Sequence, residues 1–255
     1  MNFISWNVNG IPAILKENFL EFIEAANPDL VCIQETKVSD NENNINLPNQ
    51  YYQYFNNTQN GVGGTAVFTK IKPLSTSFGT SEADSDKQGR IQTLEFENYY
   101  LVNVNSPAAG KELVNLDQKV FWMKQLNDYV EKLETTKPVI LSGTLNVTPT
   151  SQDLAKADKR KNTAGNTEPE INQFNELINS GLTDVFREFH PNEAKYTCWK
   201  DTEMARMKNQ GWRTDYFLAS NQLNPELVSM RIFDTIPGST HCPLQLTTNN
   251  LDEKG

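Results

Sequence analysis

The chain has 255 residues, a length that large α/β sandwiches and barrels often use for one domain, and we expect a single domain over residues 1–255. A hydrophobic fraction of 37% can supply a sizeable core, and no segment approaches the roughly 20 apolar residues of a membrane span. The formal net charge of −9 argues against indiscriminate binding to nucleic acid, which normally depends on positive charge, but it leaves a local basic face open.

The N-terminus reads Met-Asn-Phe-Ile-Ser-Trp and lacks the basic and apolar regions of a signal peptide, so we expect a cytoplasmic protein. Cys32, Cys198 and Cys242 are odd in number and widely spaced. They predict free thiols rather than disulfides or zinc ligands. We further expect a monomer that makes no membrane contact.

Short apolar runs bounded by turn residues predict β-strands along the whole chain. In order they cover residues 3–6, 30–33, 65–68, 91–96, 100–104, 139–141, 216–218 and 244–246. A short helix is predicted over residues 19–26, and the apolar spacing predicts a longer one over residues 116–133. Residues 156–170 are polar and are expected to form a long surface loop. Strands and helices alternate loosely, which indicates an α/β fold with a mixed sheet, or two sheets that pack together under helices.

Each half of the chain places an asparagine just past the end of a strand. Asn7 follows the first strand, and Asn146 follows the strand predicted at 139–141. Ligands of open α/β folds bind at this edge. Asparagine after a strand is also ordinary turn chemistry, so this pattern alone leaves both readings open.

Eight motifs follow one another along nearly the whole chain. They are Ser-Trp-Asn-Val-Asn-Gly at 5–10, Ile-Gln-Glu-Thr-Lys at 33–37, Gly-Val-Gly-Gly at 61–64, Gly-Arg at 89–90, Val-Asn-Val at 102–104, Leu-Asn at 145–146, Asn-Gln-Gly-Trp-Arg-Thr-Asp-Tyr-Phe at 209–217 and His-Cys-Pro at 241–243. Together they resemble the exonuclease III and apurinic/apyrimidinic (AP) endonuclease family. The resemblance implies a four-layered α/β sandwich, in which two mixed sheets pack together between flanking helices and the site lies at one edge.

The resemblance also implies roles for residues at these positions. Glu35, with Asn7, would bind a divalent ion, Mg²⁺ in the family and Mn²⁺ as an alternative, because a carboxylate after a buried strand is a good hard-oxygen ligand. His241 would contact the scissile phosphate, and Asp215 would fix its tautomer and favour its charged form. Asn7 and Asn146 would offer neutral hydrogen-bonding groups to water, nucleophile or phosphate.

The partner that the resemblance implies is duplex DNA, abasic or nicked. Residues that match or lie near the family's phosphate-facing positions are Arg90, Lys111, Arg206, Lys208 and Arg213. Such backbone contacts give affinity without sequence information. Trp212 stands where the family lines the pocket for an extrahelical abasic sugar, while Cys198 replaces a larger aromatic residue there and weakens the expected selectivity. The alternative for these residues is a set of surface salt bridges and a core tryptophan.

The catalytic set departs from the family pattern at three positions. Thr144 replaces the aspartate that orients or deprotonates the attacking water, Thr240 replaces an aspartate that helps to bind metal or position the waters, and Asn105 replaces a tyrosine that donates to the phosphate. A hydroxyl cannot serve as a base near pH 7, and losing a general base typically removes about 10²–10⁴ in rate. We therefore expect impaired hydrolysis and weak or absent Mg²⁺ binding.

Three hypotheses follow for the function. The first is a catalytically impaired DNA repair protein, diverged or engineered, that still binds damaged or nicked duplex DNA. The second is an active Mg²⁺-dependent AP endonuclease or 3′-5′ exodeoxyribonuclease in which Asp153 or another group replaces the missing base. The third is a protein-interaction module that ignores DNA. Salt-dependent binding to an abasic duplex and metal-dependent cleavage separate the three.

Overall fold

The computed structural model describes residues 1–39, 44–48, 50–58, 63–80, 88–156, 161–199 and 203–251. Gly61 and Val62 of the third motif, and residues 157–160 of the predicted surface loop, lie outside these ranges. None of the helices in the described ranges has both the length and the apolar composition needed to cross a membrane. The three cysteines are free thiols, as expected, and Cys32 and Cys242 are buried.

The first sheet has six strands and carries both ends of the chain. Its order is β11 (Leu227–Ile232), β12 (Leu244–Thr248), β1 (Asn2–Asn7), β2 (Leu30–Gln34), β4 (Thr65–Thr69) and β3 (Tyr52–Asn56). β1 and β2 are parallel, whereas the other neighbours are antiparallel. In the β1–β2 register Asn7 pairs with Gln34, so both strands end together at one edge.

The second sheet also has six strands. Its order is β5 (Ser75–Phe78), β6 (Ile91–Glu95), β7 (Tyr100–Asn105), β8 (Val139–Thr144), β10 (Asp215–Ser220) and β9 (Leu182–Asp184). β7 and β8 are parallel, and their register pairs Asn105 with Thr144. β8 and β10 are antiparallel and pair Thr144 with Asp215. The register therefore places three residues singled out in the sequence side by side.

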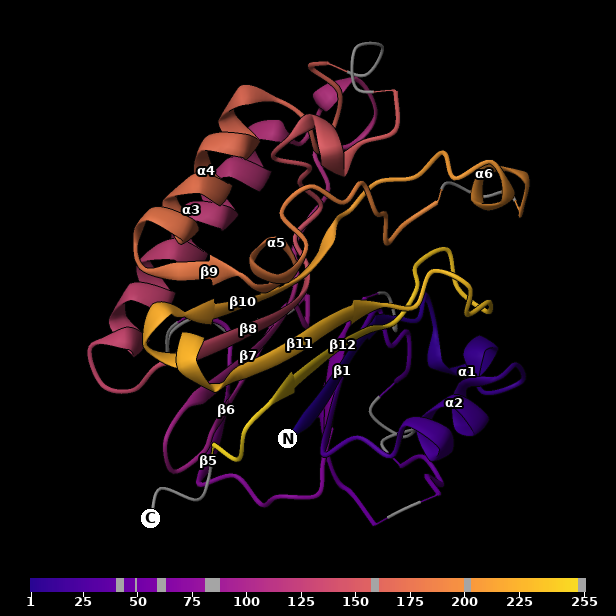
Figure 1. Ribbon diagram of the computed structural model, residues 1–255, viewed down its shortest axis with the longest axis vertical. Coiled ribbons are helices and arrows are strands. Elements are labelled where there is room, and N and C mark those ends of the chain that lie inside the picture. The colour runs from indigo at the N-terminus through magenta and orange to yellow at the C-terminus, as the bar shows by residue number, and fades with distance from the viewer. Residues whose placement is uncertain are drawn as a thin grey trace.

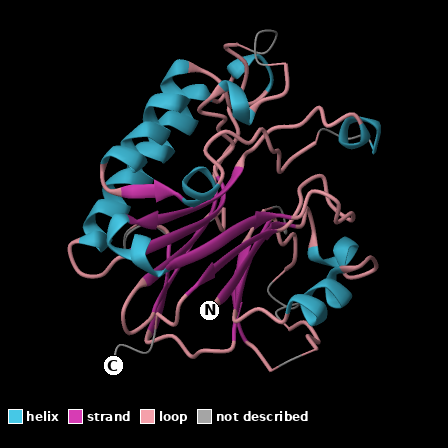
Figure 2. Ribbon diagram, viewed as in Figure 1, coloured by secondary structure: helices cyan, strands magenta, loops and turns pink. Residues whose placement is uncertain are grey.

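Helices cover the outer face of each sheet, as Figures 1 and 2 show. α3 (Leu116–Glu134) and α4 (Glu168–Asn179) lie together over the second sheet, and α1 (Ile11–Ile14) and α2 (Phe19–Ala26) lie beside the first. One apolar cluster fills the space between the sheets and two others lie under the helices. The expected four-layered α/β sandwich is confirmed. The shorter elements are α5 (Val185–Phe189), α6 (Glu203–Met207), η2 (Lys111–Leu113), η3 (Ser151–Asp153) and η5 (Asn221–Glu226).

All eight predicted strands are present, and the four strands that were missed have a common cause. β3, β5, β9 and β11 are partly exposed or short and lack a continuous apolar run. The predicted surface loop at 156–170 is wrong at its end, because α4 begins at Glu168. There Thr167 and Glu170 form a capping box, and Glu170 is fully buried, with its carboxylate accepting hydrogen bonds from the backbone of Gly165 and Thr167.

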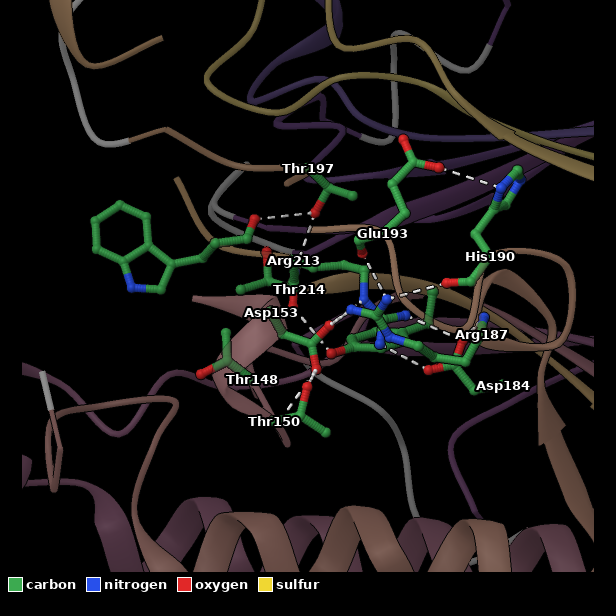
Figure 3. A network of polar contacts seen from close by, with 12 residues as sticks. Thr148, Thr150, Asp153, Asp184, Arg187, His190, Glu193, Thr197, Arg213 and Thr214 are labelled. Carbon is green, nitrogen blue, oxygen red and sulfur yellow. Dashed lines mark hydrogen bonds and ion pairs between the residues drawn. The ribbon is translucent and has the colours of Figure 1, made fainter. Parts of the chain in front are cut away.

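A buried network of ions joins the second sheet to the segment after β8 (Figure 3). The Arg213 side chain is 1% exposed; its Nε lies 2.7 Å from Asp153 Oδ1, and its Nη1 and Nη2 lie 3.0 and 2.7 Å from the two Asp184 oxygens. Arg187 also donates to Asp153, whose other oxygen accepts from Thr150. Two carboxylates and two guanidinium groups are thus balanced inside the protein.

Removing one partner of this network should cost much of the protein's stability. Arg213→Met would leave Asp153 and Asp184 short of a counter-ion in the interior, and we expect the free energy of unfolding in urea to fall by about 3–5 kcal/mol. Arg231→Met is the matched control, because Arg231 is exposed on β11 and its loss should change the free energy by less than about 0.5 kcal/mol. Equal losses for the two variants would contradict a structural role for the network.

Candidate functional site

The site lies at the edge where β1, β2, β7 and β8 end and β10 begins. The first sheet supplies Asn7 and, directly after β2, Glu35. The second supplies Asn105, Thr144 and Asp215 from three adjacent strands. His241 comes from the loop before β12, and the Trp6 ring nitrogen donates to its backbone oxygen at 3.2 Å. Residues far apart in the sequence therefore meet at the junction of the two sheets.

The segment that carries Glu35 has an unusual backbone. Glu35 and Lys37 have φ values of 54° and 51°, in the left-handed region that non-glycine residues rarely adopt. The amides of Thr36 and Lys37 donate to the carbonyl oxygens of Gly64 and Gly63 at 3.2 and 2.8 Å. A Cβ atom on Gly64 would lie only 2.3 Å from Thr36 Oγ1, so the close approach requires glycine there. Such conformations persist where the surrounding structure holds them, and they concentrate at functional sites.

Asp215 is the centre of the site. It is 3% exposed, and its carboxylate contacts four side chains: His241 Nδ1 at 2.8 Å and the hydroxyls of Thr144, Thr197 and Thr214 at 2.5, 2.6 and 3.0 Å. Burial alone would raise the pKa of Asp215, but the charge of His241 and these hydrogen bonds outweigh it and hold the pKa below its ordinary value.

The same pairing acts on His241, which is 8% exposed. Burial opposes protonation of the ring, but the charge of Asp215 and its hydrogen bond hold the pKa of His241 well above its ordinary value. The thiol of Cys198 lies beside the ring and acts in the same direction. These surroundings therefore favour the charged form of the imidazole ring.

Thr144 joins the two halves of the site. Its hydroxyl donates to Asp215 Oδ1 at 2.5 Å and accepts from Asn7 Nδ2 at 3.2 Å. Asn7 Nδ2 lies 3.3 Å from Glu35 Oε1, and Asn7 Oδ1 accepts from the backbone amide of Asn9. One chain of hydrogen bonds thus runs from Glu35 to His241. Within this series of hydrogen bonds the Thr144 hydroxyl donates its proton to the Asp215 carboxylate. A hydroxyl in this arrangement cannot take a proton from water.

Asn105 is the last residue of β7, and Asn146 lies in the loop that follows β8. Asn146 has a left-handed backbone, and its amide donates to the backbone oxygen of Ser106 at 3.0 Å. Asn105 is 5% exposed, and its backbone oxygen accepts from Arg90 at 2.9 Å. Arg90 therefore lies at the site and contacts the end of β7.

Sequence reasoning missed Lys119, which lies on the buried face of α3. Its ammonium donates to Ser106 Oγ at 2.6 Å and to the backbone oxygen of Leu145, so it connects the segments that directly follow β7 and β8. Burial lowers the pKa of Lys119 to about 7. The available signal was its place among the apolar positions of the helix, where a lysine is unexpected.

Two hollows flank Thr240. The smaller has a volume of about 360 Å³ and is lined by Ala108, Ala109, Asn146, Thr148, Ala164, Gly165, Cys198, Trp199, Trp212, Thr214 and Thr240. The larger, about 810 Å³, shares Trp199 and Thr240 and extends to Asn9, Arg206 and Ser239. Trp212 and Cys198, singled out from the sequence as pocket residues, both line the smaller hollow. Their part in binding a sugar stays a prediction.

The candidate DNA-binding residues divide into two groups. Lys111 and Lys208 are exposed and Arg90 is partly so. The expectation that Arg213 faces DNA is wrong, because its guanidinium is buried against Asp153 and Asp184. Arg206 lies over the Trp199 ring and donates to the backbone oxygens of residues 234, 236 and 239, so its principal role is to hold that loop.

The residues present would offer a divalent ion few protein ligands. Among the described residues no group of three or more His, Cys, Asp or Glu side chains could hold a metal. Glu35 Oε2 lies 3.1 Å from the Lys37 ammonium, and Asn7 turns its nitrogen rather than its oxygen toward Glu35. Lys37 also donates to Asn9. Lys37 and Asn9 belong to motifs noted in the sequence but received no role there.

Comparisons with known proteins agree with the geometry. The sequence profile described as the Endonuclease/Exonuclease/phosphatase family matches residues 4–235. The chain is 36% identical to the exodeoxyribonuclease of Bacillus subtilis over 252 residues, which are 98% of this chain and 100% of the relative. It is 40% identical to the DNA-(apurinic or apyrimidinic site) endonuclease of Dictyostelium discoideum, over 96% of this chain and 69% of the relative. The crystal structure of an AP endonuclease from Leishmania major superposes with a TM-score of 0.88 at 27% identity, over 98% of this chain and 87% of that one.

The charge state of His241 can be measured, because the chain has only two histidines. We expect its ring to titrate well above 6.5 in nitrogen-detected NMR, and Asp215→Asn to lower that pKa by removing the partner charge. Because the pKa is raised in the folded state, the stabilisation is complete below 6.5 and is lost as the pH rises through the folded value. His190→Gln identifies the signals. A His241 ring that titrates at or below 6.5 in the unaltered protein would contradict the pairing.

Proposed function

Because the chain belongs to the endonuclease/exonuclease/phosphatase family and is similar over its length to exodeoxyribonucleases and AP endonucleases, we propose that it binds duplex DNA at abasic or nicked positions and has lost most phosphodiester hydrolysis. The observation that supports the proposed loss of hydrolysis is the position of the Thr144 hydroxyl, which is hydrogen-bonded to both Asn7 and Asp215. It would shield or mark such positions rather than cut them.

Hydrolysis of a phosphodiester needs an activated water and neutralisation of the phosphoryl charge. A base must be free to accept a proton near pH 7. Thr144 is a hydroxyl whose proton is directed to Asp215, and Asp215 is surrounded by four hydrogen-bond partners and has a lowered pKa. Neither group can act as the base. Glu35, the other carboxylate of the site, contacts Lys37 and Asn7.

The groups that would bind a phosphate are better preserved than those that would cut it. Asp215 occupies His241 Nδ1, and an anion would approach the other ring nitrogen beside the Cys198 thiol, which also hydrogen-bonds the ring. Trp212 and Asn146 line the hollow beside it, where an extrahelical sugar would find an apolar wall. If a divalent ion bound, Glu35 would hold it and the ion would supply charge neutralisation, but Lys37 already contacts that carboxylate.

The surroundings of Asp153 speak against it as the substitute base. Its side chain is 0% exposed and accepts from Arg213, Arg187 and Thr150. Burial would raise the pKa of Asp153, but the charge of Arg213 and these hydrogen bonds lower it below its ordinary value. A carboxylate held in the interior by two guanidinium groups cannot reach a water at the site.

The lost activity can be tested by restoring the two carboxylates. A duplex with one abasic-site analogue is incubated with Mg²⁺ or Mn²⁺ and either the unaltered protein or a Thr144→Asp, Thr240→Asp double variant. We expect no cleavage above background by the former and a gain of about 10²–10⁴ in rate by the latter, because a base and a second anionic ligand return. Thr135→Asp, at the exposed end of α3, is the control and should stay inactive. Clear cleavage by the unaltered protein that Glu35→Ala abolishes would overturn the proposal.

Binding itself separates a DNA-binding protein from a protein-interaction module. The affinity for the abasic duplex should fall with salt, and Lys111→Met and Lys208→Met should each reduce the slope of log affinity against log salt by about one, because each removes a phosphate contact. Lys124→Met, on α3 and paired with Asp128, should leave the slope unchanged. Absence of salt-dependent binding in the unaltered protein would favour the interaction module.

A further inference from the structure

We propose that Cys198 is a nucleophile that captures the aldehyde of an abasic sugar as a reversible thiohemiacetal, so that the protein holds an abasic site through a covalent bond. The inference rests on the proposed binding of abasic DNA and names the group that would hold the sugar. It starts from Cys198 because this residue departs from the family pattern, in which a larger aromatic residue lines the pocket.

Cys198 differs from the other two cysteines in its surroundings. Cys32 and Cys242 are 0% exposed, and burial raises the pKa of the Cys32 thiol to about 12 and that of the Cys242 thiol well above its ordinary value. Cys198 is partly exposed and lines the smaller hollow beside Thr240. Because the thiolate is the reactive form of cysteine, we expect the two buried thiols to be inert and Cys198 to be the accessible nucleophile.

A histidine and an aspartate accompany the Cys198 thiol. The thiol hydrogen-bonds the His241 ring, and Asp215 Oδ2 lies 2.8 Å from Nδ1 of the same ring. The backbones of Cys198 and His241 are paired in an antiparallel bridge, which places the two side chains next to each other. A thiol, an imidazole and a carboxylate in this order are the arrangement that activates cysteine nucleophiles, because the ring moves the proton and the carboxylate orients the ring.

The hollow that Cys198 lines has the size and the walls for one sugar. Its volume of about 360 Å³ lies within the range of small-molecule pockets, and Trp199, Trp212 and Asn146 supply aromatic and polar surface. Cys198 and Trp212 exchange two backbone hydrogen bonds of 2.9 Å, which fix the thiol beside the tryptophan. Phosphate and sugar are adjacent in DNA, so a phosphate at the His241 ring would bring its sugar toward this hollow.

The proposed step adds a thiol across a carbonyl group. An abasic deoxyribose in its ring-opened form carries an aldehyde at C1′. The Cys198 sulfur forms a bond to this carbon while the π bond between carbon and oxygen breaks. The charged His241 ring gives a proton to the carbonyl oxygen and takes up the proton that the thiol releases, so no further reactant is consumed. The reverse step restores the free thiol and the aldehyde.

The first measurement compares two duplexes that differ only at the abasic position, in EDTA so that cleavage does not contribute. One carries a natural abasic site, and the other carries the same site after borohydride reduction, which keeps the phosphates but removes the aldehyde. The unaltered protein should bind the natural site about tenfold more tightly, through slower dissociation. Cys198→Ser should bind both duplexes equally, because a hydroxyl is a much weaker nucleophile at neutral pH. Cys32→Ala, which removes a buried thiol, should keep the preference.

The second measurement follows the thiol itself. Iodoacetamide should modify Cys198 in the folded protein and leave Cys32 and Cys242 unmodified, as read by peptide mass spectrometry. The natural abasic duplex should protect Cys198 more strongly than the reduced duplex does at equal saturation, because only the former occupies the sulfur with a covalent bond. Thermal melting confirms that each variant is folded.

Equal affinity of the unaltered protein for the two duplexes would overturn the covalent capture and leave the proposed DNA binding standing. A preference for the natural site that persists in Cys198→Ser would also overturn it, because another group would then hold the aldehyde. If neither duplex binds, the proposed DNA-binding function fails, and the capture fails with it.

Discussion

A carboxylate that is buried at the junction of two sheets has to be paired with a cation and fully hydrogen-bonded. Asp215 is such a carboxylate, and the residues around it supply these partners. Its partners arrive from four places: Thr144 at the end of β8, Thr197 in the segment after α5, Thr214 just before β10, and His241 from the loop that leads into the first sheet. One side chain therefore fixes the position of the two sheets at the edge where the site lies.

The same requirement explains how a threonine can stand beside Asp215. An aspartate at position 144 would place a second carboxylate within hydrogen-bonding distance of Asp215, where like charges disfavour ionisation unless a cation lies between them. The Thr144 hydroxyl donates instead, so the pair needs no cation. Lys37 has a comparable effect on Glu35. The neutral residue at position 144 and the cation beside each carboxylate thus leave the charges of the site paired without a metal.

What could be predicted from the sequence depended on how each segment is buried. The sequence predicted the strands that are buried on both faces, such as those at 139–141 and 216–218, because they are continuous apolar runs. It did not predict β5 and β11, whose residues alternate or face solvent. Motif resemblance predicted the pairing of Asp215 with His241, which lie 2.8 Å apart, but it placed Arg213 at the surface, where it is not. Its buried partner Asp153 is 60 residues away, and charged residues are rarely buried, so neither periodicity nor composition could reveal the pair.

The positions and contacts of the basic residues also limit how this acidic protein could bind DNA. Arg213 and Lys119 are buried, and Arg206 donates to the backbone of a loop. These cations therefore stabilise the fold and do not face solvent as a DNA-binding surface would require. With a net charge of −9, the protein repels DNA at long range, but salt screens that repulsion beyond about 10 Å at 0.1 M. Attraction would then have to come from the cations at contact, Lys111 and Lys208 on the surface with His241 and Arg90 at the site.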